Sequence, residues 1–227
     1  DELGDKFNFY ALDLRGHGLS SKPETGYDLE VLSNDINLFI KKLNLKNIII
    51  MGQSMGAEVS IITSLKNKNI KGCIAIDGGV INLKNKFENK QECLESLKPP
   101  NLNGIKKEKI LNMLKQSHPD WSKKAIMGQF SIFDVDDEDK VIKRLELKNH
   151  LKLLESLWDN DSLGNLKLLK VPTLFVLVNF EIDLNNFDHD KIKLEVEKLI
   201  GDHDIHAQKP EIVSKIIKER LSRKFFG

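Results

Sequence analysis

Cysteine is scarce in this sequence, which has 227 residues and only two cysteines, Cys73 and Cys93. Two cysteines form at most one disulfide, which excludes the disulfide-rich scaffolds of small secreted proteins. Cys73 lies in an apolar stretch that reads as a buried strand. We therefore expect reduced thiols, a reducing compartment and a cytoplasmic protein.

An excess of one charge and a long apolar run are also missing. The 35 Lys and Arg residues nearly balance the 34 Asp and Glu residues, for a net charge of +1. No basic cluster indicates a nucleic-acid partner. No apolar run approaches the roughly 18 residues that a membrane span needs. The hydrophobic content of 40% is enough for a core, and the length suits one α/β domain with an inserted cap.

The most informative motif present is GQSMG at positions 52–56, a G-x-S-x-G pattern. An apolar run at 48–51 precedes it and an amphipathic stretch at 59–65 follows it, so the pattern lies between an expected strand and an expected helix. In that context G-x-S-x-G is the nucleophile elbow of a serine hydrolase, a sharp turn that exposes the serine hydroxyl. We therefore expect Ser54 to be a nucleophile.

The elbow also makes predictions about its neighbours. A side chain at Gly52 or Gly56 is expected to collide where the strand and the helix pack closely. The helix that follows directs its free N–H groups towards the site. The amide of Met55 is therefore expected to help hold an oxyanion.

A second motif, DLRGHGLSS at positions 13–21, follows the strand-like stretch 7–12. With these two motifs the sequence resembles the α/β-hydrolase superfamily. The resemblance implies an α/β-hydrolase fold, with a doubly wound, mostly parallel sheet and an inserted helical cap. It also implies a structural rather than a catalytic role for His17.

The same resemblance concerns the N-terminus. Members of the superfamily usually have several strands before the one at 7–12, and a His-Gly loop in that part supplies the second oxyanion amide. This chain begins with Asp1 and reaches that strand within seven residues. We therefore expect a truncated chain whose N-terminal strands are missing, and an upstream signal peptide remains an open alternative.

The expected elements divide the chain into three parts. Residues 1–79 form the first part of the hydrolase core, 80–169 a helical cap, and 170–227 the second part of the core. The expected core elements are helices at 28–43 and from Pro210 onwards, and strands at 72–76, 171–178 and 194–199.

Three segments of the cap resemble a largely uncharacterised subgroup of these hydrolases, namely 97–104, 118–122 and 150–158. The resemblance identifies no substrate. Large or titratable side chains in these segments either pack the cap helices or line a pocket: Trp121, Trp158 and His150.

A serine hydroxyl needs a base within hydrogen-bond reach, and the base needs an orienting acid. The resemblance implies that the histidine follows the last strand, in the loop 201–210, and that the first histidine of that loop is the base. We therefore favour His203, with His206 as the alternative and, more simply, as a loop-packing residue. A metal site at these histidines lacks a third ligand at a sensible spacing, so no metal is expected.

The position of the acid is open. The usual place is the turn after the strand that ends at Val178, where Glu181 and Asp183 lie, although the glycine usual in that turn is absent. Some α/β hydrolases place the acid after the strand that follows the nucleophile helix, and Asp77 lies there. Glu181 and Asp77 rank level, with Asp183 behind them. Asp77 could instead cap the turn at 78–79.

The expected function is hydrolysis of an ester or related acyl bond of a small organic substrate, through an acyl-enzyme on Ser54. This chemistry requires no metal or organic cofactor. The same triad also supports C–C, lactone or amide hydrolysis and acyl transfer, and the motifs do not choose among them. A ligand-binding protein that keeps the fold without catalysis is a further alternative. The oligomeric state does not follow from the sequence.

Overall fold

The computed structural model describes residues 7–80, 82–179 and 192–227. Its main sheet contains four parallel strands in the order β1-β2-β5-β6, namely β1 (Ile48–Gln53), β2 (Ile70–Ile76), β5 (Thr173–Val178) and β6 (Leu194–Leu199). The two central strands are almost entirely apolar, as expected for parallel strands covered on both faces. The doubly wound parallel sheet predicted from the sequence is confirmed.

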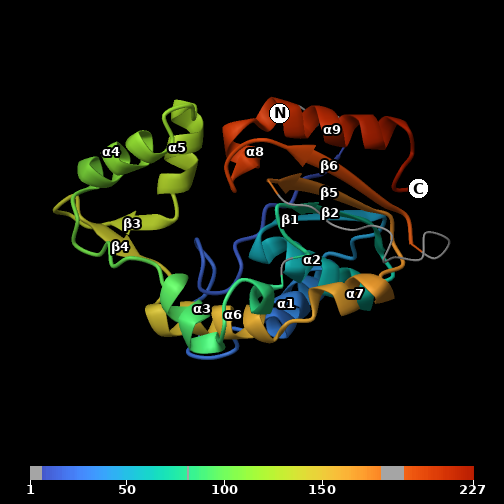
Figure 1. Ribbon diagram of the computed structural model, residues 1–227, viewed down its shortest axis with the longest axis horizontal. Helices are drawn as coiled ribbons and strands as arrows, with labels where there is room; N and C mark the ends of the chain where they lie inside the picture. The colour runs from blue at the N-terminus through green and yellow to red at the C-terminus, as the bar shows by residue number, and fades with distance from the viewer. Residues whose placement is uncertain (1–6, 81, 180–191) are drawn as a thin grey trace.

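Helices cover both faces of this sheet (Figure 1). On one face lie α1 (Leu29–Lys42), α2 (Met55–Lys66) and α7 (Ser162–Leu168), and on the other α8 (Ile205–Gln208) and α9 (Pro210–Ser222). The first layer packs Ala57, Ile61 and Leu166 against Phe175 of the sheet. The second packs Val213 and Ile216 against β2 and β5. The chain therefore has one core on each side of the sheet.

Residues 82–169 are mainly helical. They include a short 3₁₀ helix (Leu83–Asn85), α3 (Lys90–Ser96), α4 (Lys107–Ser117), α5 (Lys123–Phe130) and α6 (Leu147–Asp159). The sequence did not predict the antiparallel hairpin of β3 (Phe133–Val135) and β4 (Val141–Lys143). Helix α6 packs its Leu153 against α1.

Helices α4 and α5 and the hairpin form an outer lobe, residues 102–144, which stands apart from the sheet in Figure 1. Its own core contains four buried side chains, those of Ile110, Phe130, Phe133 and Val141. The boundaries 1–79, 80–169 and 170–227 remain a prediction.

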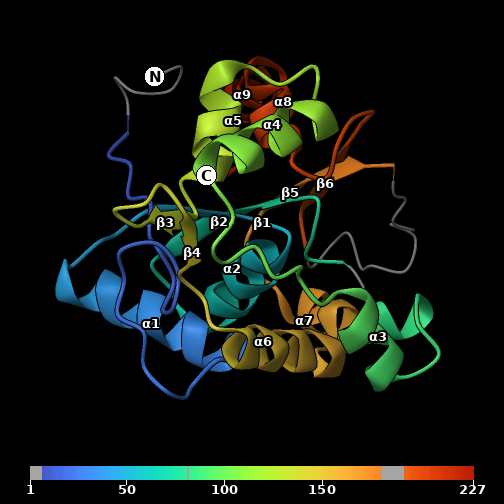
Figure 2. The same ribbon diagram turned by 90° about the vertical axis from the view of Figure 1, so that its left-hand side faces the viewer.

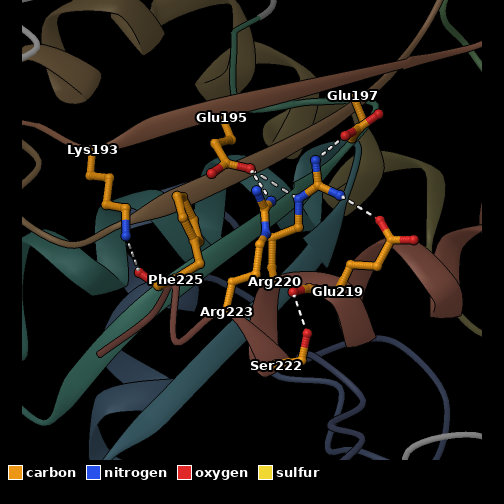
Figure 3. Close-up of polar contacts among 8 residues, drawn as sticks. All are labelled: Lys193, Glu195, Glu197, Glu219, Arg220, Ser222, Arg223 and Phe225. Atoms are coloured by element: carbon orange, nitrogen blue, oxygen red, sulfur yellow. Dashed lines mark hydrogen bonds and ion pairs between the residues drawn. The ribbon is translucent and has the colours of Figure 1, made fainter.

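Helix α9 is tied to β6 by ion pairs that Figure 3 shows. The guanidinium of Arg220 is 7% exposed and pairs with Glu195 at 3.0 Å, and also with Glu197. Arg223, which caps the end of the helix, shares Glu195 at 3.0 Å. A nearly buried cation surrounded by carboxylates is compensated rather than isolated, so these pairs fix the helix over the strand that leads into the histidine loop.

The prediction of a strand at 7–12 is wrong. These residues are described without a strand ladder, and Phe9 and Tyr10 are exposed. A strand needs a neighbour that supplies hydrogen bonds. Among the described residues β1 ends the sheet on its side, and the stretch 7–12 pairs with none of the four strands.

The two cysteines are buried and form no disulfide, and burial raises the pKa of the Cys73 thiol to about 12. In the part of the chain that is described, no helix is both long and apolar enough to cross a bilayer.

Candidate active site

Ser54 lies at the turn between β1 and α2, with backbone angles of φ 52° and ψ −120°. A positive φ is costly for a residue with a Cβ, and such strain often marks functional turns. The Ser54 amide donates to the Ile76 carbonyl oxygen at 2.9 Å, which ties the turn to the end of β2. The nucleophile elbow predicted from the sequence thus has the geometry that the motif requires.

Close approach at this turn requires two glycines. A Cβ on Gly52 would overlap the Gly56 carbonyl group, and a Cβ on Gly78 would overlap the Ser54 carbonyl oxygen. The predicted collision at Gly52 is therefore confirmed. The predicted collision at Gly56 is wrong, because a Cβ there meets nothing within 4 Å. It is the carbonyl group of Gly56 that lies close to β1.

Met55 is the first residue of α2. The first amides of a helix have no intrahelical acceptor and carry the positive end of the helix dipole. Met55 therefore has the position that an oxyanion donor needs, although its role stays a prediction.

His203 is paired with Asp77. The imidazole Nδ1 lies 2.5 Å from the Asp77 Oδ2, while the other carboxylate oxygen accepts from the Val178 amide at 2.9 Å. The Asp77 side chain is 13% exposed and its backbone has φ 41°. Two hydrogen bonds thus hold the carboxylate at the carboxyl end of β2, and the bond to the Asp77 carboxylate raises the pKa of His203 above its ordinary value.

A further bond connects the elbow with the histidine loop. The side-chain amide of Gln53, the residue before Ser54, donates to the His203 backbone oxygen at 3.1 Å. The loop after β6 is therefore joined to the turn after β1, 150 residues away in the sequence. Three positions expected in one site, Ser54, Asp77 and His203, thus meet at one end of the sheet.

Two of the candidate acids, Glu181 and Asp183, lie outside the described residues. Among the described carboxylates, Asp77 is the one bonded to His203, and the choice of acid remains a proposal. His206 lies on the exposed side of α8. His17 bonds through Nδ1 to the Arg15 carbonyl oxygen at 3.0 Å, which agrees with a structural role in its loop.

A small cleft of about 160 Å³ borders the Asp77 side of the imidazole, and Lys86 and Val178 are among its lining residues. A larger cavity of about 540 Å³ lies elsewhere, between residues 24–28 and α6. Of the aromatic residues considered for a pocket, Trp121 is buried, and its indole N–H donates to Asp202 at 2.9 Å. Neither that contact nor the bond of Gln53 to the histidine loop could be predicted from a local pattern, because the partners come from distant segments.

Residues 1–134 match the profile of a family described as the alpha/beta hydrolase fold. The chain belongs to this family. Similar curated proteins include 2-(acetamidomethylene)succinate hydrolase of Mesorhizobium japonicum, 41% identical over 33% of this chain and 27% of that protein. Ethanol acetyltransferase 1 of Hanseniaspora uvarum is 37% identical over 32% and 22% of the two chains. N-formylmaleamate deformylase of Pseudomonas putida is 40% identical over 27% and 23%.

The aligned segments thus span about a quarter of the length of these curated relatives. Among solved structures, one of E-2-(acetamidomethylene)succinate hydrolase matches with a TM-score of 0.76 and 22% identity. That match covers 97% of this chain and 83% of the other. An esterase from Exiguobacterium antarcticum matches with a TM-score of 0.64 and 19% identity, over 92% and 80%. At these identities the structural likeness shows the fold alone.

Proposed function

We propose that this α/β-hydrolase-fold protein is a serine hydrolase that cleaves an ester or related acyl bond of a small organic substrate. The observation that carries the proposal is the bond of 2.5 Å between His203 and Asp77, in a loop joined through Gln53 to the strained turn of Ser54. An imidazole oriented by a carboxylate, in a loop bonded to the residue before an elbow serine, supports the assignment of an activated nucleophile.

In this mechanism the Ser54 hydroxyl attacks the substrate carbonyl carbon and His203 takes the hydroxyl proton on Nε2. Asp77 bonds Nδ1, which leaves Nε2 as the free ring nitrogen and stabilises the imidazolium that forms. The Met55 amide stabilises the oxyanion. Departure of the leaving group, protonated by His203, leaves an acyl group on Ser54, and His203 then activates water to release it. None of these steps requires a metal or organic cofactor.

The names of the relatives bear on which acyl bond is cleaved. One is named for a compound with an acetamido group, one for removal of a formyl group and one for acetyl transfer to ethanol. All three names describe acyl groups bound to nitrogen or oxygen. Amide hydrolysis and acyl transfer are therefore the second candidate functions, because the same acyl-enzyme serves either acceptor. The names favour neither lactone nor C–C hydrolysis.

A fluorophosphonate probe tests the proposal directly, because it reacts with an activated serine and not with an ordinary one. The wild-type protein should be labelled at neutral pH, with the adduct at Ser54 by mass spectrometry. Ser54→Ala should abolish the adduct and His203→Ala should nearly do so. If the wild-type protein melts cooperatively but remains unlabelled, the enzyme proposal is wrong and a ligand-binding role replaces it.

A further inference from the structure

The turn between α4 and α5 of the outer lobe reaches the loop that carries His203. Asp202, the residue before His203, accepts a hydrogen bond from the Trp121 indole N–H at 2.9 Å and lies 3.0 Å from the His118 Nδ1. A carboxylate only accepts, so Nδ1 is the donor in the second bond. The His118 and Trp121 rings are stacked, with centroids 4.0 Å apart. One carboxylate of the histidine loop thus binds two ring donors of another lobe.

A second bridge runs beside the first. The Gln208 side-chain amide donates to the Asp120 carboxylate at 2.6 Å, and its oxygen accepts from the Asp202 backbone amide at 2.7 Å. The lobe therefore bonds both the side chain and, through Gln208, the backbone of the residue before His203. Figures 1 and 2 both show α5 beside α8.

The loop has little freedom between these contacts. Gly201 has no room for a Cβ, which would meet Ile205 and Gln208, and Ile205 is fully buried. The His203 carbonyl oxygen is held by the side-chain amide of Gln53. A shift at Asp202 is therefore transmitted to His203 rather than absorbed by the loop.

The bridge is also electrostatically suited to its place. The hydrogen bond from His118, and after it that from Trp121, lowers the pKa of Asp202 below its ordinary range. Asp202 therefore stays ionised at neutral pH, and bonds to an ionised acceptor are stronger than bonds between neutral groups. Trp121 is only 7% exposed, so an indole N–H without its acceptor would be left unsatisfied away from solvent.

We propose that Trp121, His118 and Asp202 position the proposed catalytic base, so that the outer lobe, through Asp202, sets the direction of the His203 imidazole. The inference rests on the proposed function and adds positioning residues to it. It makes the activity of the serine depend on the seating of the outer lobe against α8. A lobe displaced from α8 leaves His203 bonded to Asp77 and Gln53 but removes the hydrogen bonds that hold Asp202, the residue before it.

The test compares Trp121→Phe and Asp202→Ala with the wild-type protein. Trp121→Phe keeps a large ring and removes the N–H donor, and Asp202→Ala removes the acceptor. We expect the maximal rate of phosphonylation of Ser54 to fall about 10- to 100-fold, because a misplaced base loses alignment, while the half-saturating probe concentration stays nearly constant. Amide hydrogen exchange over residues 201–209 should become faster in both variants.

Two control variants separate positioning from general weakening. Asp134→Asn weakens the ion pairs of the lobe residue Asp134 with Arg144 and Lys22, neither of which bonds the histidine loop, and should change neither the rate nor the exchange in 201–209. His118→Asn keeps a side-chain N–H close to the Nδ1 position and should retain much more activity than His118→Ala. Rescue by the conservative variant supports positioning.

The outcomes are distinct from those of the functional proposal. If the wild-type protein is not labelled, the proposed function fails, and hydrogen exchange still decides whether the bridge orders the loop. Unchanged labelling and unchanged exchange in Trp121→Phe and Asp202→Ala would overturn the inference. A change confined to the half-saturating probe concentration would also overturn it, because the bridge would then affect probe binding rather than the position of His203.

Discussion

The central sheet buries side chains on both faces, whereas the outer lobe closes around four buried side chains and a two-stranded hairpin. The sheet brings Ser54 and Asp77 to the ends of neighbouring strands, so their separation follows from strand pairing. Within the described part of the chain, the outer lobe bonds the histidine loop through side chains that reach Asp202 and Gln208. Rigid placement thus comes from the sheet, and the lobe contributes a few polar bonds that can be broken singly.

The largest effect should come from the acid. Asp77→Ala removes the partner of His203 and should lower turnover of a chromogenic ester by about 10³- to 10⁴-fold. Glu181→Ala and Asp183→Ala are the matched controls and should leave turnover near the wild-type value. Equal loss in Glu181→Ala and none in Asp77→Ala would move the acid to the turn after β5.

The next largest effect should come from truncating one buried side chain in each region, which should lower the free energy of unfolding by different amounts. Phe175 is fully buried in the sheet, and Phe175→Ala should lower the free energy of unfolding by about 3–5 kcal/mol. Phe133→Ala, in the outer lobe, should change the main urea transition by only about 1 kcal/mol or less, since the lobe can open locally. Urea unfolding followed by circular dichroism measures both. Equal losses would mean that lobe and sheet unfold as one unit.

Two glycines of the elbow can then be compared by the same substitution, because each variant adds one methyl group. Gly52→Ala must push the strand and the helix apart and should cost about 1–3 kcal/mol of unfolding free energy, with loss of labelling. Gly56→Ala adds its methyl group to open space within α2 and should be neutral or stabilise by up to about 1 kcal/mol. Thermal melts of both variants decide it, and a costly Gly56→Ala would contradict the packing described.

The smallest expected change is a displacement of the pH profile. Because Asp77 raises the pKa of His203, the neutral base becomes abundant only at higher pH, and kcat/KM should rise with pH through that raised pKa. In Asp77→Asn the inflection should move to lower pH. The pair's contribution to stability runs the other way: it is complete below the ordinary histidine pKa and is lost as pH rises through the raised one. A profile identical in both proteins would place another group at the inflection.

Local patterns in the sequence were enough for much of the fold. The boundaries of β6 at Leu194–Leu199 and of α1 after its Asp28 cap follow from periodicity and capping within one segment. The prediction of a strand at 7–12 failed because a strand needs a neighbouring strand, and no local pattern shows whether one is present. The hairpin of the outer lobe was not predicted, because its strands have only three residues each and carry too short a pattern.

The candidate site divides in the same way. The elbow carries its own spacing rule, and Ser54 could be named from it. Asp77 could be named as a candidate acid but not preferred over Glu181, because its bond to a histidine 126 residues later is not visible in a local pattern. The contact of Trp121 with Asp202 could not be foreseen, since it joins lobes whose relative placement the sequence does not encode locally.

An acid at the end of β2 has a consequence for how such a protein can vary. With Asp77 as the proposed acid, nucleophile and acid follow consecutive strands of the chain, β1 and β2, and the proposed mechanism uses no side chain from the segment after β5. Selection on chemistry therefore acts on two short turns near the N-terminal half and on the histidine loop. On that proposal, insertions, deletions or grafted binding sequences between β5 and β6 should leave the reaction intact, provided that the Val178 amide still holds Asp77.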